Sequence, residues 1–304
     1  MTVLVIGEAL VDIIDGRRRP GGSPMNVAIG LGRLGVPTVL HTSLGDDAAG
    51  RLLETHVRAS GVALTPQSRG TASTSVAEVS IDSTGAPTYR FAITWDPDPV
   101  DVAAGGYRAV HVGSISAMMR PGASVLDAVL DASRASALLT YDLNVRPALM
   151  GAPGPARARA EQIIARVDVV KASDEDIAWL YPDLPADRVI ERWLAAGARL
   201  AVLTRGARGA SAATATTAVE VAAAEVLVRD TVGAGDSFMA GILAALDDAG
   251  LLTAAGRGRL PVLDREELRR VVGFGIRCAA VTVTREGADP PWRVDVRSAG
   301  VGYA

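Results

Sequence analysis

Short runs of β-forming residues alternate with helical patterns along the whole of this 304-residue chain, and this alternation limits the folds that are open to it. The strand-type runs lie at residues 3–6, 39–42, 109–112, 138–142, 167–170 and 200–204, and each is followed by a turn signal. Parallel strands joined by helices produce this order, whereas β-sandwiches and helix bundles do not. We therefore predict an α/β fold with a doubly wound, mostly parallel sheet that is flanked by helices.

A β-hairpin interrupts this alternation in the first third of the chain. Residues 75–81 and 88–93 each alternate with a period of two, on either side of Asp82-Ser83-Thr84-Gly85. This pattern predicts a hairpin that forms a flap on the α/β frame. We expect one α/β domain over residues 1–304, with a small β lid formed by about residues 10–22 and 74–96. Residues 210–228 are expected to form short strands.

The charge balance argues against nucleic acid as a partner. The 34 acidic and 31 basic residues give a formal net charge of −3, which leaves no basic face for a phosphate backbone. No apolar run reaches the roughly 18 residues of a membrane span. The first ten residues show no signal-peptide pattern, and the single cysteine, Cys278, permits no intrachain disulfide. We expect a cytoplasmic protein that acts on small molecules.

The chain has a single lysine, and this excludes the classes of enzyme that need a lysine in a fixed motif. Lys171 is the single lysine among the 31 basic residues, and it ends a predicted strand in the context Val-Lys-Ala. A Walker A loop needs Gly-Lys followed by Ser or Thr, so the P-loop NTPases are excluded. The three histidines, His41, His56 and His111, lie far apart in the sequence and form no metal-ligand pattern with Cys278.

The segment Gly30-Leu31-Gly32-Arg33-Leu34-Gly35 matches the dinucleotide fingerprint G-x-G-x-x-G but stands in the wrong context. Ser23-Pro24 supplies an N-cap and a first helical residue, so these glycines fall in the second half of a helix. A dinucleotide site needs them between a strand and the start of a helix. We interpret them as positions of close helix packing, with Gly35 as the C-terminal cap.

The most informative stretch is residues 230–236 (DTVGAGD), which lead directly into a helical pattern. The backbone amides of Gly233, Ala234 and Gly235 would line a concavity at the positive end of that helix, which is an anion site without any lysine. Asp236 would stand at its rim, as a base that deprotonates an attacking hydroxyl during phosphoryl transfer. An ordinary Asp N-cap behind a glycine turn is the alternative.

Two segments of the chain resemble the signatures of one known family. Residues 230–238 are similar to the second signature of the ribokinase-like (PfkB) carbohydrate kinases, and residues 21–28 (GGSPMNVA) are similar to the first. Further family blocks lie at residues 7–12, 45–50, 142–147 and 281–288, so the resemblance spans nearly the whole chain. The motifs GGSPMN and DLNVRP are most similar to those of fructokinases and 2-keto-3-deoxygluconate kinases. The resemblance implies a ribokinase-like fold and transfer of the γ-phosphoryl group of ATP to a sugar hydroxyl.

Carried over position by position, the resemblance implies that Asp236 is the base and that residues 233–235 form the anion hole. It assigns sugar binding to Asp12, Gly21, Gly22, Asn26, Asn144 and Arg146. It assigns ATP binding to Lys171, Thr204, Gly206 and Gly209. A carboxylate can accept from two sugar hydroxyls, and an amide both donates and accepts, which agrees with these roles. For Asp12 and Asn26 alone, loop or capping roles are the alternative, and for Lys171 an exposed strand end.

The residues that would support a metal ion depart from the family pattern. The family usually has Asn-x-x-Glu where this chain has Ser173-Asp174-Glu175-Asp176, which also makes a helix capping box. The resemblance implies Mg²⁺ with the ATP, and Asp176 is the remaining carboxylate that would act on it through a bound water, with pure capping as the alternative. The resemblance also implies a monovalent cation such as K⁺ near Asp230 and the loop at Gly287.

The flap bears on the choice of sugar. Kinases of 2-keto-3-deoxygluconate place Tyr and Arg on the flap strand, and this chain has Ala92 and Ile93 at those positions. We therefore favour fructose or a similar neutral sugar. Arg17-Arg18-Arg19, Arg90 and Arg146 leave 2-keto-3-deoxygluconate or another anionic sugar as the alternative, although three arginines in a loop usually form a solvated tip.

An alternative of another class is a catalytically silent sugar or nucleotide sensor that retains the fold. Such a protein has no need of the base Asp236, so its presence favours the enzyme. The resemblance also implies a homodimer through the exposed lid hairpin.

Overall fold

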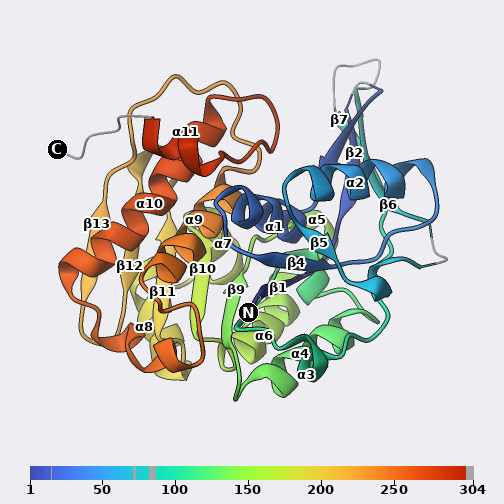
Figure 1. The fold of residues 1–304 in the computed structure, drawn as a ribbon. Coiled ribbons are helices and arrows are strands. Elements are labelled where there is room, and N and C mark those ends of the chain that lie inside the picture. Colours follow the sequence, from blue (N-terminus) through green and yellow to red (C-terminus); the bar gives the residue numbers. More distant parts are fainter. Residues whose placement is uncertain (15, 71–72, 82–86, 299–304) are drawn as a thin grey trace.

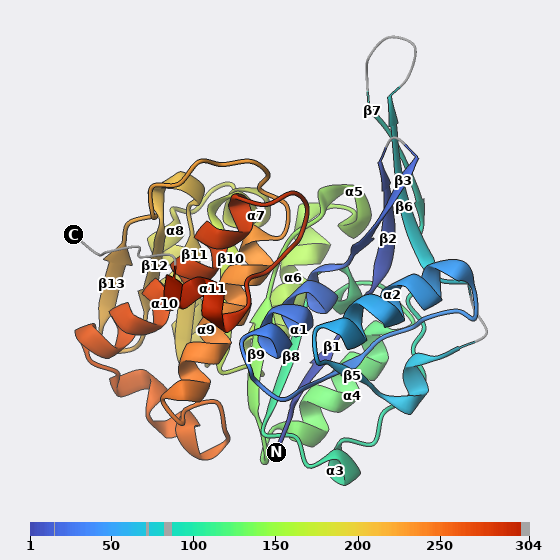
Figure 2. The ribbon, with the colours of Figure 1, turned by 45° about the horizontal axis from the view of Figure 1, so that its top comes forward.

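The computed structural model describes residues 1–14, 16–70, 73–81 and 87–298 of the chain. Two β-sheets organise this part of the protein. A large sheet of strand order β13-β12-β11-β10-β9-β8-β1-β4-β5 carries helices on both faces, and a small sheet of order β3-β2-β6-β7 projects from the body (Figures 1 and 2). No helix among the described residues is both long and apolar enough to cross a membrane.

The strands of the large sheet follow the predicted segments closely. They are β1 (Val3–Ile6), β4 (Thr38–His41), β5 (Ala63–Leu64), β8 (Ala109–Gly113), β9 (Leu138–Asp142), β10 (Val169–Ser173), β11 (Leu200–Thr204), β12 (Ala210–Ala213) and β13 (Ala218–Val221). All neighbouring pairs from β5 to β11 are parallel, and β12 and β13 are added in antiparallel orientation. The predicted mostly parallel, doubly wound sheet is confirmed.

One strand begins two residues later than its pattern suggests. The run at residues 167–170 predicts a strand, but β10 covers Val169–Ser173. Asp168 precedes the strand, where its Oδ2 accepts the amide hydrogen of Leu139 (2.9 Å) and its own amide donates to the carbonyl oxygen of Leu139 (2.8 Å). The shift places Lys171 in the middle of the strand, where only 3% of its surface is exposed. The alternative of an exposed strand end is therefore wrong.

The direction of strand order reverses beside β1. From β1, the chain adds β4 and β5 on one side and then β8 to β13 on the other. In open α/β sheets, ligands bind outside the carboxyl ends of the strands next to such a reversal. A binding site is therefore expected at the carboxyl ends of β1, β8 and their neighbours.

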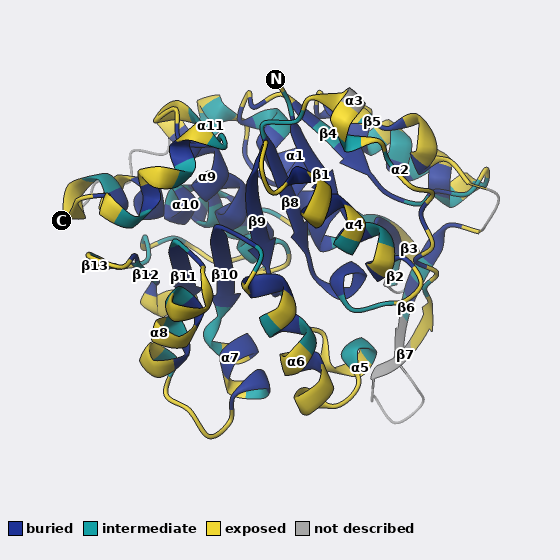
Figure 3. Cartoon of the chain, turned by 90° about the horizontal axis from the view of Figure 1, so that it is seen from below, coloured by how far each residue is buried: buried dark blue, intermediate teal, exposed yellow. Residues whose placement is uncertain are grey.

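Different helices cover the two faces of the large sheet. One face carries α1 (Ser23–Arg33), α2 (Ala48–Ala59), α9 (Ala234–Asp248), α10 (Arg265–Val283) and α11 (Arg293–Ser298), and the other carries α4 (Ala123–Ser133), α6 (Pro153–Ile164), α7 (Asp174–Leu180) and α8 (Ala186–Ala196). The short helices are α3 (Val102–Gly105) and α5 (Pro147–Met150), and the 3₁₀ turns are η1 (Pro66–Ser68), η2 (Ile115–Ala117), η3 (Gly206–Arg208), η4 (Ala255–Gly258) and η5 (Leu260–Val262). Side chains alternate along the strands, so Val3 and Val5 of β1 enter one core and Leu4 and Ile6 enter the other. Figure 3 shows the buried residues between these layers and the exposed ones outside.

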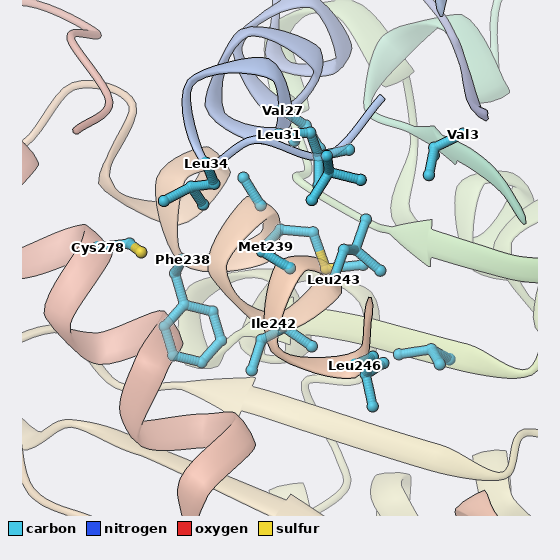
Figure 4. Close-up of a cluster of buried hydrophobic side chains, with 14 of the residues drawn as sticks. Val3, Val27, Leu31, Leu34, Phe238, Met239, Ile242, Leu243, Leu246 and Cys278 are labelled. Atoms are coloured by element: carbon cyan, nitrogen blue, oxygen red, sulfur yellow. The ribbon is translucent and has the colours of Figure 1, made fainter. Parts of the chain in front are cut away.

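The packing of α1 against α9 sets the relative positions of the two family signatures. Leu31 of α1 and Met239 of α9 lie in the same buried cluster (Figure 4). Gly30 allows the two helices to approach closely, because a Cβ at this position would lie 2.6 Å from the Cβ of Ala240. The interpretation of residues 30–35 as a helix-packing segment is confirmed.

The small sheet consists of β2 (Leu10–Ile14), β3 (Arg17–Gly21), β6 (Ser75–Ile81) and β7 (Pro87–Ala92). The predicted turn at residues 82–85 lies outside the described residues. The three arginines 17–19 were expected in a loop, but they belong to β3, because their backbone pairs with β2 in a register that sets Arg19 opposite Asp12. Arg19 also forms an ion pair with Glu286, which follows α10 on the main body.

Candidate active site

The two signature segments meet at one carboxylate. Asp236, in the first turn of α9, is buried with 7% of its surface exposed. The hydroxyl of Ser23 donates a hydrogen bond to its Oδ1 (2.6 Å), and Nδ2 of Asn26 donates one to its Oδ2 (2.8 Å). Ser23 and Asn26 are three residues apart, so one turn of α1 presents both donors on the same side. The carboxylate is held in one orientation.

Ser23 is a functional contact that sequence reasoning missed. Its position before a helix predicts an N-cap, but the N-cap of α1 is Gly22 and no side chain caps this helix. The Ser23 hydroxyl bonds instead to a carboxylate 213 residues further along the chain. The only sequence signal was the spacing of Ser23 and Asn26 on one helix face.

Gly22 and Asn26 shape the turn and the polar surface beside this carboxylate. Gly22 has a φ of 107°, in the region that favours glycine, and a Cβ there would lie 2.5 Å from the carbonyl oxygen of Glu8. Oδ1 of Asn26 is buried and has no hydrogen-bond partner among the described residues. A buried acceptor without a partner is costly, and a bound hydroxyl group would satisfy it.

The beginning of α9 provides unpaired backbone donors. Gly233 caps this helix with a φ of 75°, and the amides of Gly233, Gly235 and Asp236 donate no hydrogen bond to any described residue. The amide of Ala234 donates to the carbonyl oxygen of Thr231 (3.2 Å), so its predicted role in the anion hole is not supported by this geometry. The three unpaired amides are therefore those of Gly233, Gly235 and Asp236. Free amides at a helix N-terminus form a site for an anion.

Lys171 lies against this same helix end. Its Nζ donates to Oδ2 of Asp142 (2.9 Å), and both side chains are buried. A Cβ on Gly235 would come within 3.1 Å of this Nζ, so the glycine leaves space for the ammonium group. Burial alone would lower the pKa of Lys171, but the carboxylates of Asp142, Asp176 and Asp236 raise it above its ordinary value. The single lysine of the chain is therefore a fixed positive charge beside the free amides.

On the side of the small sheet, Asp12 and Arg146 lie near enough for their charges to interact. Asp12 lies on β2, and Gly21 of β3 makes room for it, because a Cβ on Gly21 would lie 2.1 Å from Oδ2 of Asp12. Burial raises the pKa of Asp12 to about 6, and the charge of Arg146 opposes this rise. Nη1 of Arg146 donates to Oδ1 of Asn144 (2.8 Å). The predicted sugar-binding residues 12, 21, 144 and 146 thus lie together.

Two residues at the carboxyl ends of strands have strained backbones that no sequence pattern indicated. Ser114, after β8, has a φ of 57°, and Asn144, after β9, has a φ of 36°. Neither is glycine, and the Ser114 hydroxyl donates to the carbonyl oxygen of Asn144 (3.4 Å). Such conformations cost roughly 1–3 kcal/mol each and concentrate at functional sites. The strain supports a binding role for this edge of the sheet.

Glu8 is another missed residue, between β1 and β2. Its side chain is buried and accepts a hydrogen bond from the amide of Ser116 (3.1 Å). Burial raises its pKa to about 7. Its carbonyl group also lies against Gly22, so it packs on the turn that was predicted to bind the sugar. The sequence signal that could have singled out Glu8 was its position in the family block at residues 7–12.

The predicted ATP-binding turn lies at the same edge of the sheet, after β11. Thr204 ends this strand, and its hydroxyl donates to the carbonyl oxygen of Ala172 (3.4 Å). Gly206 and Gly209 have φ values of 54° and 88°, and the amide of Arg205 donates to the carbonyl oxygen of Gly209 (2.8 Å). These contacts close a tight turn one strand away from Lys171.

Asp176 caps α7 with its carboxylate. Its Oδ2 accepts from the amide of Ser173 (2.7 Å) and its Oδ1 from the amide of Val145 (2.7 Å). The predicted capping box is therefore present, and Asp176 also fixes the loop that carries Asn144. Among the described residues, no group of three or more His, Cys, Asp or Glu side chains is arranged to hold a metal ion.

Asp230 joins the anion loop to the loop after α10. Its Oδ1 accepts from the amide of Val232 (3.0 Å) and its Oδ2 from the amide of Gly287 (2.7 Å), and these bonds lower its pKa. A Cβ on Gly233 would lie 2.6 Å from the Cβ of Ala288, so the second loop packs directly on the helix cap. The described residues thus place Asp230 and Gly287 together, as expected.

A buried carboxylate next to free amides at a helix N-terminus is an arrangement that suits phosphoryl transfer without a Walker A loop. The family model of the pfkB family carbohydrate kinases matches residues 6–294. The chain therefore belongs to the pfkB family of carbohydrate kinases, as its sequence predicts.

Similar proteins agree with this assignment. A fructokinase of Rhizobium leguminosarum bv. trifolii is 36% identical over 286 residues, which cover 88% of this chain and 85% of that protein. The crystal structure of fructokinase with bound ATP from Xylella fastidiosa has a TM-score of 0.83 and 27% identity, over 98% of this chain and 97% of that one. A fructokinase double mutant of Vibrio cholerae O395, with fructose, ADP and a potassium ion bound, shares the fold with a TM-score of 0.78 and 24% identity, over 94% and 93% of the two chains.

Proposed function

We propose that this carbohydrate kinase transfers the γ-phosphoryl group of ATP to a hydroxyl group of fructose or a similar neutral sugar. The observation that carries the proposal is the position of Asp236. Its carboxylate is held by Ser23 and Asn26 on the sugar side, and its own amide belongs to the free set at the start of α9. A base and an anion site in one helical turn are what transfer to an alcohol requires.

In this reaction Asp236 takes the proton of the sugar hydroxyl as the oxygen attacks the γ-phosphorus. A bond forms between that oxygen and phosphorus, the bond to the β,γ-bridging oxygen breaks, and ADP leaves with the electron pair. Ser23 and Asn26 keep the carboxylate aimed, and the unpartnered Oδ1 of Asn26 accepts a second sugar hydroxyl. Alignment of this kind lowers the entropic part of the barrier.

The transferred group is stabilised by the amides of Gly233, Gly235 and Asp236 and by the ammonium group of Lys171. Mg²⁺ bound with the nucleotide would neutralise further phosphate charge. Because both oxygens of Asp176 accept backbone amides, its contact with Mg²⁺ would pass through water and use the remaining lone pairs.

Fructose is favoured by two observations. The similar proteins named above are fructokinases. In addition, Asp12 brings a carboxylate to the sugar side, and such a group repels an anionic sugar while it accepts hydrogen bonds from neutral hydroxyls. A carboxylate-bearing sugar would need Arg146 released from Asn144.

The remaining predictions concern ions, assembly and location. The pairing of Asp230 with Gly287 supports a monovalent-cation site beside the anion loop, and the potassium ion of the Vibrio relative is consistent with it. The two edge strands of the small sheet, β3 and β7, pair on one side only among the described residues, which supports a homodimer through the lid. A cytoplasmic location and the absence of nucleic-acid partners stay predictions.

A coupled ADP-release assay with ATP, Mg²⁺ and a sugar panel tests the function. The panel contains fructose, glucose, ribose and 2-keto-3-deoxygluconate, with and without K⁺. We expect the highest kcat/KM on fructose, and no turnover in Asp236→Asn although sugar binding, measured by calorimetry, is retained. A higher kcat/KM on 2-keto-3-deoxygluconate than on fructose would overturn the proposal of a neutral sugar substrate. Sugar binding without turnover by the unmodified protein would indicate the sensor.

A further inference from the structure

Lys171 stands where a cation is normally disfavoured. Its Nζ lies beside Gly235 in the first turn of α9, at the positive end of the helix dipole. The free amides of this turn carry that positive potential. A buried ammonium group also gives up its hydration, so the arrangement costs free energy until an anion binds. The structure must therefore contain a group that stabilises this charge when the site holds no phosphate.

Asp142 is that group, and the architecture of the sheet explains why. Lys171 on β10 and Asp142 on β9 are register partners in neighbouring parallel strands, so both side chains rise from the same face of the sheet. Their charged atoms are 2.9 Å apart, and their side chains are 3% and 0% exposed. Gly113, the register partner of Asp142 on β8, adds no side chain beside it. The carboxylate contacts no solvent.

The other charged groups around Lys171 are already engaged elsewhere. Asp236 is held by Ser23 and Asn26, and Asp176 by two backbone amides. His111, on β8, is neutral, because burial lowers its pKa to about 3 and its Nδ1 contacts the hydroxyl of Thr140. Asp142 differs from them, since its Oδ2 bonds to Lys171 and its Oδ1 is buried with no partner among the described residues. Burial raises the pKa of Asp142 to about 7, and the charge of Lys171 opposes this rise, so the ionised pair is the form that the 2.9 Å contact stabilises.

We propose that Asp142 is a positioning residue for catalysis, which keeps Lys171 protonated and directed at the anion site so that the ammonium group is ready for the phosphates of ATP. Asp142 does not touch the nucleotide in this scheme and acts only through Lys171. The proposal rests on the proposed function, because ATP is the anion.

Four variants test this proposal: Asp142→Asn, Lys171→Met, the two combined, and Asp168→Asn as a matched control. Asp168 is also a buried, ion-paired aspartate beside β10, but it lies at the opposite end of the strand. The measurements are ATP dissociation constants by calorimetry, KM for ATP and sugar, kcat/KM for ATP from pH 6 to 10, and thermal unfolding.

We expect Lys171→Met to weaken ATP binding about tenfold or more and to lower kcat, because a donor to the transferred group is lost. Asp142→Asn should weaken ATP binding to a similar degree and move the alkaline decline of kcat/KM down by at least about one pH unit, since a buried lysine without its counter-charge loses its proton more readily. KM for the sugar should change less than about twofold in both. Asp168→Asn should lower the unfolding temperature and leave the pH profile unchanged.

The combined Asp142→Asn and Lys171→Met variant distinguishes a positioning role of Asp142 from a purely structural one. It leaves no buried charge alone, so its unfolding temperature should exceed that of either single variant. Its ATP affinity should equal that of Lys171→Met, because Asp142 has no effect without the lysine. If Asp142→Asn does not fold, this comparison carries the test. An Asp142→Asn enzyme with normal ATP affinity and an unchanged alkaline decline would overturn the proposal, as would a combined variant that binds ATP normally. Because ATP binding is measured directly, these results are distinct from a failure of sugar turnover.

Discussion

Two buried acid–base clusters lie at opposite ends of the large sheet, and they differ in how completely the carboxylate oxygens of their buried aspartates are paired. At the amino end, Asp168 accepts from the amide of Leu139 with one oxygen and pairs with Arg199 and Arg257 through the other. At the carboxyl end, Asp142 uses one oxygen for Lys171 and leaves the other without a partner among the described residues.

The difference separates stability from function. The Asp168 cluster ties β9, β10 and the η4 turn together, and every charge has its counterpart. The carboxyl end accumulates features that a fold avoids when stability alone matters: strained φ values at Ser114 and Asn144, free amides at α9, and a buried acceptor on Asn26. Ligands are expected to satisfy these groups.

The largest effect is expected from Asp236→Ala at the carboxyl end. Loss of the base should lower kcat at least about a hundredfold, the lower range for removal of a positioned proton acceptor. The unfolding temperature should change little, because Ser23 and Asn26 can bond to water that fills the space. Steady-state kinetics with fructose measure the effect, and a variant with near-normal kcat would exclude Asp236 as the base.

Glu8→Gln tests whether burial at this end strains the folded state. Burial raises the pKa of Glu8 from 4.5 to about 7, so the folded protein binds this proton more tightly than the unfolded chain does. The resulting contribution to stability is complete below pH 4.5 and is lost as the pH rises through 7. Relative to Glu8→Gln, the unmodified protein should therefore lose about 3 kcal/mol of unfolding free energy over that interval.

Denaturant unfolding of both proteins at a series of pH values measures this difference. Glutamine keeps the size and hydrogen-bonding capacity of protonated glutamate but does not titrate. Parallel stability curves for the two proteins would contradict the prediction.

At the amino end, Asp168→Asn should affect stability and not catalysis. Two arginines lose their counter-charge, and the unfolding free energy should fall by about 2 kcal/mol, less than for a fully buried pair because both guanidinium groups are partly exposed. kcat and both KM values should stay within about twofold of normal. A large loss of kcat in Asp168→Asn would contradict the conclusion that the amino end of the sheet serves stability and not catalysis.

The smallest effect is expected from Asp12→Asn on the small sheet. The amide retains the shape of the side chain but weakens its hydrogen bonds to sugar hydroxyls, so KM for fructose should rise about tenfold. KM for ATP should not change, since Asp12 lies near Arg146, among the residues that we propose to bind the sugar. An increase in KM for ATP, with KM for fructose unchanged, would contradict the assignment of Asp12 to sugar binding.

Much of the site could be predicted because its main parts are local motifs. Residues 230–236 and 21–26 each combine glycines, a helix start and a polar side chain within one turn, and such patterns are legible without tertiary structure. The contact between Ser23 and Asp236 could not be predicted in this way, because it joins residues 213 positions apart. The strained φ values of Ser114 and Asn144 also escaped prediction, because serine rarely adopts a positive φ and a single asparagine after a strand does not by itself indicate one.

The sequence by itself determined the α/β order of strands and helices, the absence of a Walker A loop and the family, because each follows from local periodicity or from residues that are close in the chain. Only the tertiary structure decided that Lys171 is buried against Asp142 beside α9, and that the Ala234 amide donates to the carbonyl oxygen of Thr231. The reason is physical: burial and pairing of a charge depend on which strands become neighbours, and backbone propensity carries no information about that choice.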